Sequence, residues 1–71
     1  MDLVEIFGRN VREARSQLGW TQEQLALECG LKRTYLTEIE GGKRNPTLEV
    51  VQRISMALEI SASELMRPPK K

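Results

Sequence analysis

The chain has 71 residues, which is room for one small domain with a modest core. Eleven Lys and Arg residues stand against ten Asp and Glu residues, so any surface that attracts a polyanion must be local. One cysteine, Cys29, and no histidine exclude a disulfide framework, a multi-cysteine metal site and a histidine base. There is no glycine-rich phosphate loop either, so we expect no enzyme, no metal and no cofactor.

The sequence also lacks the segments that direct a chain to a membrane. No run approaches the roughly 20 apolar residues of a transmembrane helix. The start, MDLVEIFGRN, has acidic residues where a signal peptide needs a basic region. We therefore expect a soluble, cytoplasmic protein with no membrane partner. We expect Cys29 to be a small, semi-buried apolar side chain, with a reactive thiol as the alternative.

Residues 2–18 predict an amphipathic helix. Its apolar stripe has intervals of four, four, three and four and consists of Leu3, Phe7, Val11, Ala14 and Leu18. Gly19 suits the left-handed position that follows a helix end. The next helix begins with a predicted capping box of Thr21 and Gln24, and Gly30 ends it after about two turns.

A third short helix is expected from residue 32 or 33 to residue 40. At about 100° per residue, Leu36 and Ile39 fall on one side, with Tyr35 flanking them. The other side is polar and consists of Arg33, Thr34, Thr37 and Glu38. Two glycines end the helix, and KRNP predicts an exposed loop.

Two more helices are expected after this loop. Thr47 is the predicted N-cap of a fourth helix that runs to about residue 59. Its inward positions are Val51, Ile54 and Leu58. Ser61 and Glu64 predict a second capping box, for a fifth helix that begins at Ala62. The sequence RPPKK cannot continue that helix.

The five expected helices make one compact, all-α domain over residues 1–66, followed by a flexible C-terminal tail over residues 67–71. The second and third helices are short and joined by a tight glycine turn, and Ala26 is small enough for a close helix approach. These two helices predict a helix-turn-helix unit, which presents its second helix on a convex surface.

The stretch TQEQLALECGLKRTYLTEIEGGKRNPTLEVVQRISMALEISASEL resembles the phage-repressor and Cro class of helix-turn-helix proteins, called XRE-like. The resemblance covers residues 7–65 and implies a lambda-repressor-like fold. Gln22, Ala26, Gly30, Leu36 and Ile39 stand where that family has its glutamine, small residue, turn glycine and two core positions. GLKRTYLTEIEGGKRN also resembles the small controller proteins of restriction–modification systems, which are single-domain dimers of about this size.

The polar side of the third helix is the predicted base-reading surface. Arginine can bind guanine through two hydrogen bonds, glutamate can accept from cytosine, and a threonine methyl can touch thymine. By itself such a polar side is more often an ordinary solvated helix surface, and it is the surrounding motif that favours DNA. The predicted base contacts are Arg33, Thr34, Thr37 and Glu38.

A second group of residues is predicted to contact DNA phosphates: Gln22, Lys32, Tyr35, Lys43, Arg44 and Asn45. For Tyr35 the alternative is an aromatic at the core edge, and for Asn45 it is a turn before Pro46. Many family members have Ser, Thr or Asp where this chain has Lys32, so the helix cap is weaker there by about 1 kcal/mol. A bound phosphate would offset the repulsion between this lysine and the positive end of the helix.

The resemblance also implies structural roles. Arg15 and Glu40 occupy the positions that form an ion pair between the first and third helices. The end of the fourth helix and the fifth helix are expected to form a two-fold dimer interface from Met56, Ile60, Leu65 and Met66, with completion of the core as the alternative.

We therefore expect a homodimeric, sequence-specific DNA-binding transcriptional regulator. Each third helix would enter a major groove of a pseudo-palindromic operator, with half-sites about 34 Å apart. RNA polymerase would be a further partner if the protein is an activator. The rival interpretation is a protein-interaction module, such as an antitoxin-type or adaptor protein, whose helix-turn-helix unit presents a surface to another protein.

Overall fold

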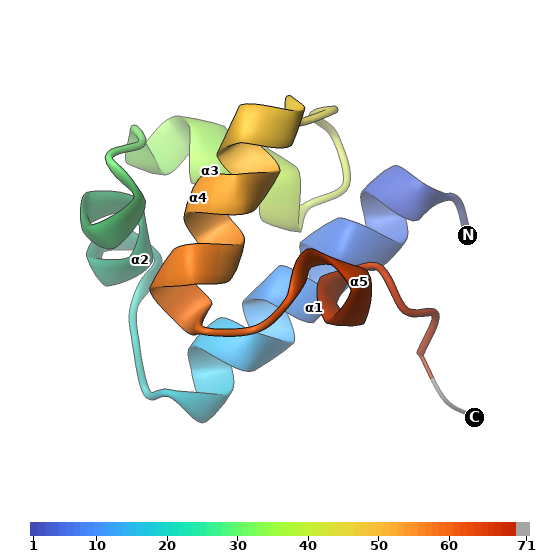
Figure 1. Ribbon diagram of the computed structural model, residues 1–71. Coiled ribbons are helices and arrows are strands. Elements are labelled where there is room, and N and C mark those ends of the chain that lie inside the picture. The colour runs from blue at the N-terminus through green and yellow to red at the C-terminus, as the bar shows by residue number, and fades with distance from the viewer. Residues whose placement is uncertain (70–71) are drawn as a thin grey trace.

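Five α-helices account for most of residues 1–69, the part of the chain that the computed structural model describes, and this part contains no strand (Figure 1). In chain order they are α1 (Leu3–Gln17), α2 (Gln22–Cys29), α3 (Arg33–Glu40), α4 (Leu48–Leu58) and α5 (Ala62–Leu65). The all-α, five-helix prediction is confirmed. The last two residues of the expected tail, 70 and 71, lie outside the described residues.

Side-chain caps fix where the helices begin. The predicted capping box at α2 is present: Thr21 Oγ1 accepts from the Gln24 amide at 3.1 Å, and Gln24 Oε1 accepts from the Thr21 amide at 2.8 Å. Asp2 and Glu5 form a second box at α1, with both bonds at 3.0 Å. This box was not predicted, although the spacing Asp-x-x-Glu can be read directly from the chain.

The box predicted at α5 forms only in part. Ser61 Oγ accepts from the Glu64 amide at 3.2 Å, but the Glu64 carboxylate pairs with Arg67 at 3.1 Å instead of turning back to the cap. Both partners of that ion pair are exposed, so the competing contact is in solvent.

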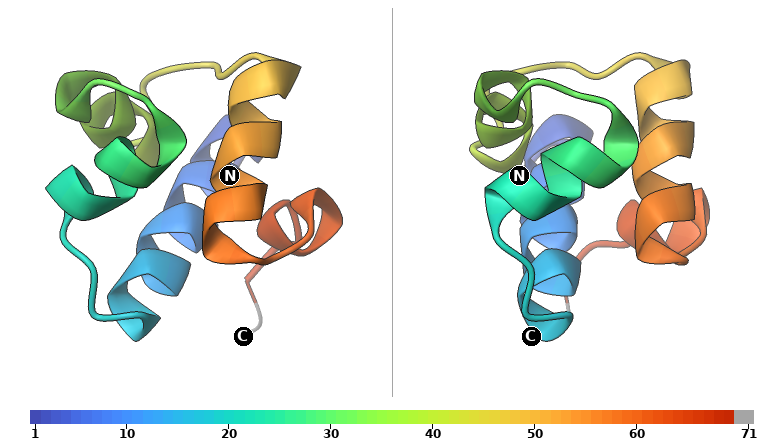
Figure 2. Two further views of the ribbon diagram at one scale, coloured as in Figure 1. Left: turned by 60° about the vertical axis from the view of Figure 1, so that its left-hand side comes forward. Right: turned by 90° about the vertical axis from the view of Figure 1, so that its left-hand side faces the viewer.

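The core lies where α1 meets the other helices. In Figure 2, α1 runs between α3 on one side and α4 and α5 on the other, and it packs against all three. The largest fully buried side chains are Phe7, Val11, Leu25, Leu36, Ile39, Ile54 and Leu65. The predicted stripe of α1 is wrong at its ends, because Leu3 and Leu18 are 53% and 49% exposed. They lie at the first residue and at the C-cap of α1, where the neighbouring helices cover less of it.

A glycine allows α1 and α3 to approach closely. Gly8 is buried in the middle of α1, and a Cβ built on it would lie 2.0 Å from the carbonyl oxygen of Ile39. A glycine inside a helix usually costs about 1 kcal/mol relative to alanine. Here only glycine has the shape that fits, so the α1–α3 contact is made by backbone against backbone.

An ion pair joins the same two helices near the C-terminal end of each. Arg15 Nε lies 2.8 Å from Glu40 Oε2, and Nη2 lies 3.0 Å from Oε1, so the guanidinium binds the carboxylate through two hydrogen bonds. The third nitrogen, Nη1, donates to the carbonyl oxygen of Trp20 at 2.8 Å. The side chains of Arg15 and Glu40 are only 13% and 2% exposed. The hydrogen bond to Glu40 raises the pKa of Arg15.

A single asparagine fastens α5 to α1. Asn10 Nδ2 donates to the carbonyl oxygens of Leu65 and Arg67, at 2.7 and 2.8 Å. These carbonyl groups lie at the end of α5, where intrahelical partners run out. The contact therefore holds a helix of four residues that is too short to be stable by itself.

The close approach at Gly8 predicts that its replacement by alanine lowers the free energy of unfolding by at least about 2 kcal/mol, because the new methyl would force the backbones of α1 and α3 apart. Urea unfolding followed by circular dichroism measures this. Gly41→Ala is the matched control, since its φ is −82° and a Cβ there would meet its nearest neighbour at 3.4 Å. Equal destabilisation by the two substitutions would contradict the close-approach argument.

The ion pair predicts that Glu40→Ala destabilises the protein by about 3 kcal/mol, because it leaves a mostly buried guanidinium without its partner. Glu49→Ala is the control, because Glu49 pairs with Arg53 at 3.0 Å in solvent and should cost less than about 1 kcal/mol. Arg15→Lys, which keeps the charge but loses the paired hydrogen bonds, should give an intermediate loss. The same urea unfolding assay measures all of these substitutions. If Glu40→Ala lowers the free energy of unfolding as little as Glu49→Ala does, the Arg15–Glu40 pair does not have this stabilising role.

Candidate nucleic-acid interface

The rotation of α3 is set by its two buried apolar residues. Leu36 and Ile39 have no exposed surface, and they hold the helix against α1 and α2. The four residues predicted to read bases, Arg33, Thr34, Thr37 and Glu38, are all exposed. The structure therefore places these side chains together on the side of α3 that faces away from the core.

The N-terminal end of α3 carries positive charge and has no side-chain cap. Lys32 occupies the N-cap position in an extended conformation and makes no capping hydrogen bond, and α3 has no acidic residue in its first turn. Lys32 and Arg33 are both exposed there. Together with the helix dipole they form a local positive end, which suits an anionic partner.

The loop after α3 is tied back to that helix. Arg44 Nε and Nη2 lie 2.9 and 2.8 Å from Glu38 Oε1, and the Arg44 guanidinium carbon lies 4.9 Å from the centre of the Tyr35 ring. Glu38 was predicted to contact bases and Arg44 to contact a phosphate, but a contact between the two residues was not predicted. Both side chains are about half exposed, so their pairing is worth less than about 1 kcal/mol and a phosphate can displace Glu38 from Arg44. Lys43 and Asn45 are exposed in the same loop.

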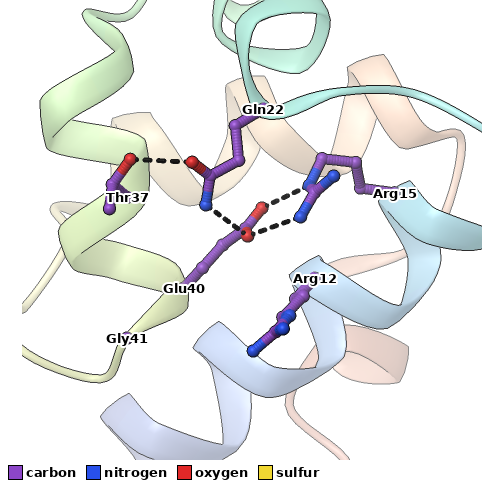
Figure 3. Close-up of a pocket in the computed structure, with 6 residues that line it drawn as sticks. All are labelled: Arg12, Arg15, Gln22, Thr37, Glu40 and Gly41. Atoms are coloured by element: carbon purple, nitrogen blue, oxygen red, sulfur yellow. Dashed lines mark hydrogen bonds and ion pairs between the residues drawn. The ribbon is translucent and has the colours of Figure 1, made fainter.

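The amide of Gln22 is occupied inside the protein (Figure 3). Its Nε2 donates to Glu40 Oε1 at 2.9 Å, and its Oε1 accepts from the Thr37 hydroxyl at 2.9 Å. The orientation of the amide is clear because a carboxylate can only accept. Thr37 Oγ1 also lies 2.9 Å from the carbonyl oxygen of Arg33, so its one hydrogen is shared between two acceptors. Gln22 was predicted to contact a phosphate, and its role in joining α2 to α3 was not predicted.

The same close-up shows a polar hollow of about 300 Å³ between α1, α2 and α3 (Figure 3). It is lined by Arg12, Arg15, Gln22, Thr37, Glu40 and Gly41. Four of these residues are in the predicted set. Arg12, an exposed residue of α1, was not predicted as a site residue. Helical periodicity identifies an outward residue but does not reveal what lies across from it.

The residues predicted to form a dimer interface do not all reach the surface. Leu65 is 2% exposed and belongs to the core, so its assignment to an outward contact is wrong. Met56 is 69% exposed and lines a hollow with Leu18 and Trp20. Met66 is partly buried and lines a different hollow, next to Leu48, while Ile60 packs at the edge of the core.

The described residues show few features of a site with a reactive thiol or a bound metal. Cys29 is buried, and burial raises the pKa of its thiol to about 11, which favours the apolar interpretation over a reactive thiol. Residues 1–69 contain no group of three or more metal-ligating side chains. No helix in this part of the chain is long and apolar enough to cross a membrane.

Comparison with known proteins identifies the family. A family model described as helix-turn-helix matches residues 11–65. Control protein C.BamHI of Bacillus amyloliquefaciens is 44% identical over 62 residues, which cover 86% of this chain and 76% of that protein. A hypothetical transcription factor of Neisseria meningitidis is 38% identical over 69 residues, which cover 97% of this chain and 65% of that protein's length.

The solved structures agree with the sequence comparisons. The restriction–modification controller protein C.AhdI from Aeromonas hydrophila superposes with a TM-score of 0.84 at 39% identity, over 87% of this chain and 94% of that one. The family match covers the helix-turn-helix unit of α2 and α3 together with α4 and α5. The chain therefore belongs to the helix-turn-helix family, in its XRE-type branch, and is a DNA-binding transcriptional regulator of that family.

Proposed function

We propose that the protein binds a pseudo-palindromic operator as a homodimer, with one α3 in each of two successive major grooves. The observation that carries this proposal is the exposed polar side of α3, which is free of apolar residues and is flanked by cations at both ends. An α-helix fits the major groove of B-DNA, where each base pair presents a distinct pattern of donors and acceptors. A two-fold dimer places its recognition helices about 34 Å apart, one turn of DNA.

The proposed contacts divide into two groups. Base edges are read by Arg33, Thr34, Thr37 and Glu38. Phosphates are contacted by the N-terminal end of α2 at Gln22 and by Lys32, Tyr35, Lys43, Arg44 and Asn45. Tyr35 is partly buried, and the exposure of the other α3 and loop residues supports their access to DNA. For Gln22 we assign the contact to the helix end, since its amide holds Glu40 and Thr37.

We extend the proposal to the control of restriction–modification genes, because the similar protein C.AhdI is described as a restriction–modification controller protein and C.BamHI as a control protein. The chain then acts through occupancy of its operator and without catalysis, in the cytoplasm or nucleoid of a bacterium. If occupancy activates a promoter, RNA polymerase is a second partner.

Two substitutions test the division between residues that read bases and residues that contact phosphates. Arg33→Ala should weaken operator binding by about 1–3 kcal/mol and relax the sequence preference at one position, because a bidentate base contact is lost. Lys43→Ala should weaken operator and random DNA alike and flatten the salt dependence by about one unit, because a phosphate contact is lost. Fluorescence anisotropy over a salt series measures both. The same effect from both substitutions would contradict the division.

Selection of bound sequences from a random DNA pool would identify the operator sequence. The proposal expects an enriched two-fold symmetric motif with half-sites one turn apart. If no palindrome is enriched, and the protein instead retains a stoichiometric protein partner without DNA, the interaction-module interpretation replaces it.

The homodimer is proposed to form through the end of α4 and α5, with an apolar surface made of the exposed Met56 and the partly buried Ile60 and Met66. A domain of this size buries a limited core, so covering this surface in a dimer also adds stability. Met56→Glu and Met66→Glu should each raise the dimer dissociation constant by at least about tenfold, because a charge would be buried in an apolar contact.

Sedimentation equilibrium without DNA measures this, and Leu27→Glu is the matched control. Leu27 is a strongly exposed apolar residue on α2, outside the proposed interface. A dimer unaffected by the two methionine substitutions but disrupted by the control would place the interface elsewhere.

A further inference from the structure

We propose that the polar hollow between α1, α2 and α3 is a binding site for one DNA phosphate, and that Arg12 is the cation that holds it. The inference rests on the proposed function, because it adds a contact to the same DNA surface. It assigns a binding role to a residue of α1, outside the helix-turn-helix unit itself.

The floor of the hollow is an ion pair that is already complete. Both oxygens of the Glu40 carboxylate are engaged, Oε2 by Arg15 Nε at 2.8 Å and Oε1 by Arg15 Nη2 at 3.0 Å and Gln22 Nε2 at 2.9 Å. The Glu40 side chain is almost wholly buried beneath these donors. The negative charge at the bottom of the hollow is therefore neutralised and covered.

Arg12 supplies the positive charge that remains. It precedes Arg15 by three residues on α1, so the two side chains lie on one face of that helix. Within residues 1–69 Arg12 makes no ion pair and no side-chain hydrogen bond. Arg12 and Arg15 contribute two positive charges and Glu40 one negative charge, which leaves one net positive charge around the hollow.

The position of the hollow links it to DNA. Thr37, on the proposed base-reading side of α3, and Gln22, at the start of α2, both line it, so it lies next to the surface that faces the duplex (Figure 3). The Gln22 amide is bound to Glu40 and Thr37, so it offers a phosphate little at this place. The guanidinium of Arg12 has five donors in a planar fork that matches phosphate geometry.

The test compares Arg12→Gln with Arg9→Gln, a matched loss of an exposed arginine from the same helix outside the hollow. Binding of the full chain to the selected operator and to a random duplex of equal length is measured over a potassium chloride series. Arg12→Gln should weaken both DNAs about five- to tenfold near 0.1 M salt and reduce the slope of log K against log salt by about 0.9, the value for one phosphate on B-DNA. Arg12→Lys should keep the slope, since it keeps the charge, and Arg9→Gln should leave both quantities near those of the native chain.

The outcomes separate this inference from the proposed function. If Arg12→Gln behaves like Arg9→Gln while Lys43→Ala still flattens the slope, the phosphate site is refuted and the proposed function stands. If Arg12→Gln changes the selected sequence, the residue reads bases and the inference is also refuted. If the native chain binds neither DNA, the proposed function fails and the phosphate site fails with it.

Discussion

The contact between α1 and α3 is the constraint on which the rest of the structure depends. At Gly8 the two helices meet backbone to backbone, because a glycine leaves the space that the Ile39 carbonyl occupies. Near their C-terminal ends Arg15 and Glu40 join the same helices through two hydrogen bonds and opposite charges. A close contact and an ion pair separated along one helix fix both the distance and the direction of α3. The exposed side of α3 therefore has one orientation relative to the rest of the domain.

From this junction a chain of hydrogen bonds reaches the surface that we propose to face DNA. Glu40 accepts from Gln22, and Gln22 accepts from Thr37, which lies on the exposed side of α3. The three helices that must be held in register, α1, α2 and α3, thus share one polar cluster. Such a cluster is stable only when every member is satisfied, and no buried side-chain nitrogen or oxygen within residues 1–69 lacks a partner. The polar groups next to the proposed recognition surface stabilise the fold, and the exposed cations around them are the ones that we propose to contact phosphates.

The net charge of the chain does not show how its charged residues are distributed and paired. Acidic residues on or near the proposed recognition surface would oppose DNA binding, and each of the two in α3 is paired with an arginine. Glu40 is buried against Arg15, and Glu38 is paired with Arg44 above the Tyr35 ring. The first pair is shielded from water, whereas the second is half exposed and weak enough to exchange partners. The local surface is therefore positive even though the whole chain is nearly neutral.

The sequence by itself determined the features that depend on residues close together in the chain. The capping box of Thr21 and Gln24, the glycine that ends α2, and the rotation of α3 set by Leu36 and Ile39 follow from local hydrogen bonding and from 3.6 residues per turn. These features, with the family resemblance, were enough for the five helices and for the exposed side of α3.

Only the tertiary structure decided what lies across from each residue, because those partners are distant in the chain. It showed Gly8 against Ile39, Asn10 on the carbonyl groups of α5, and the Gln22 amide on Glu40. It also showed that Leu65, which was predicted to lie at a surface, is buried in the core. Periodicity gives the direction in which a side chain points, but the packing of separate helices decides whether it meets water, a core or a partner.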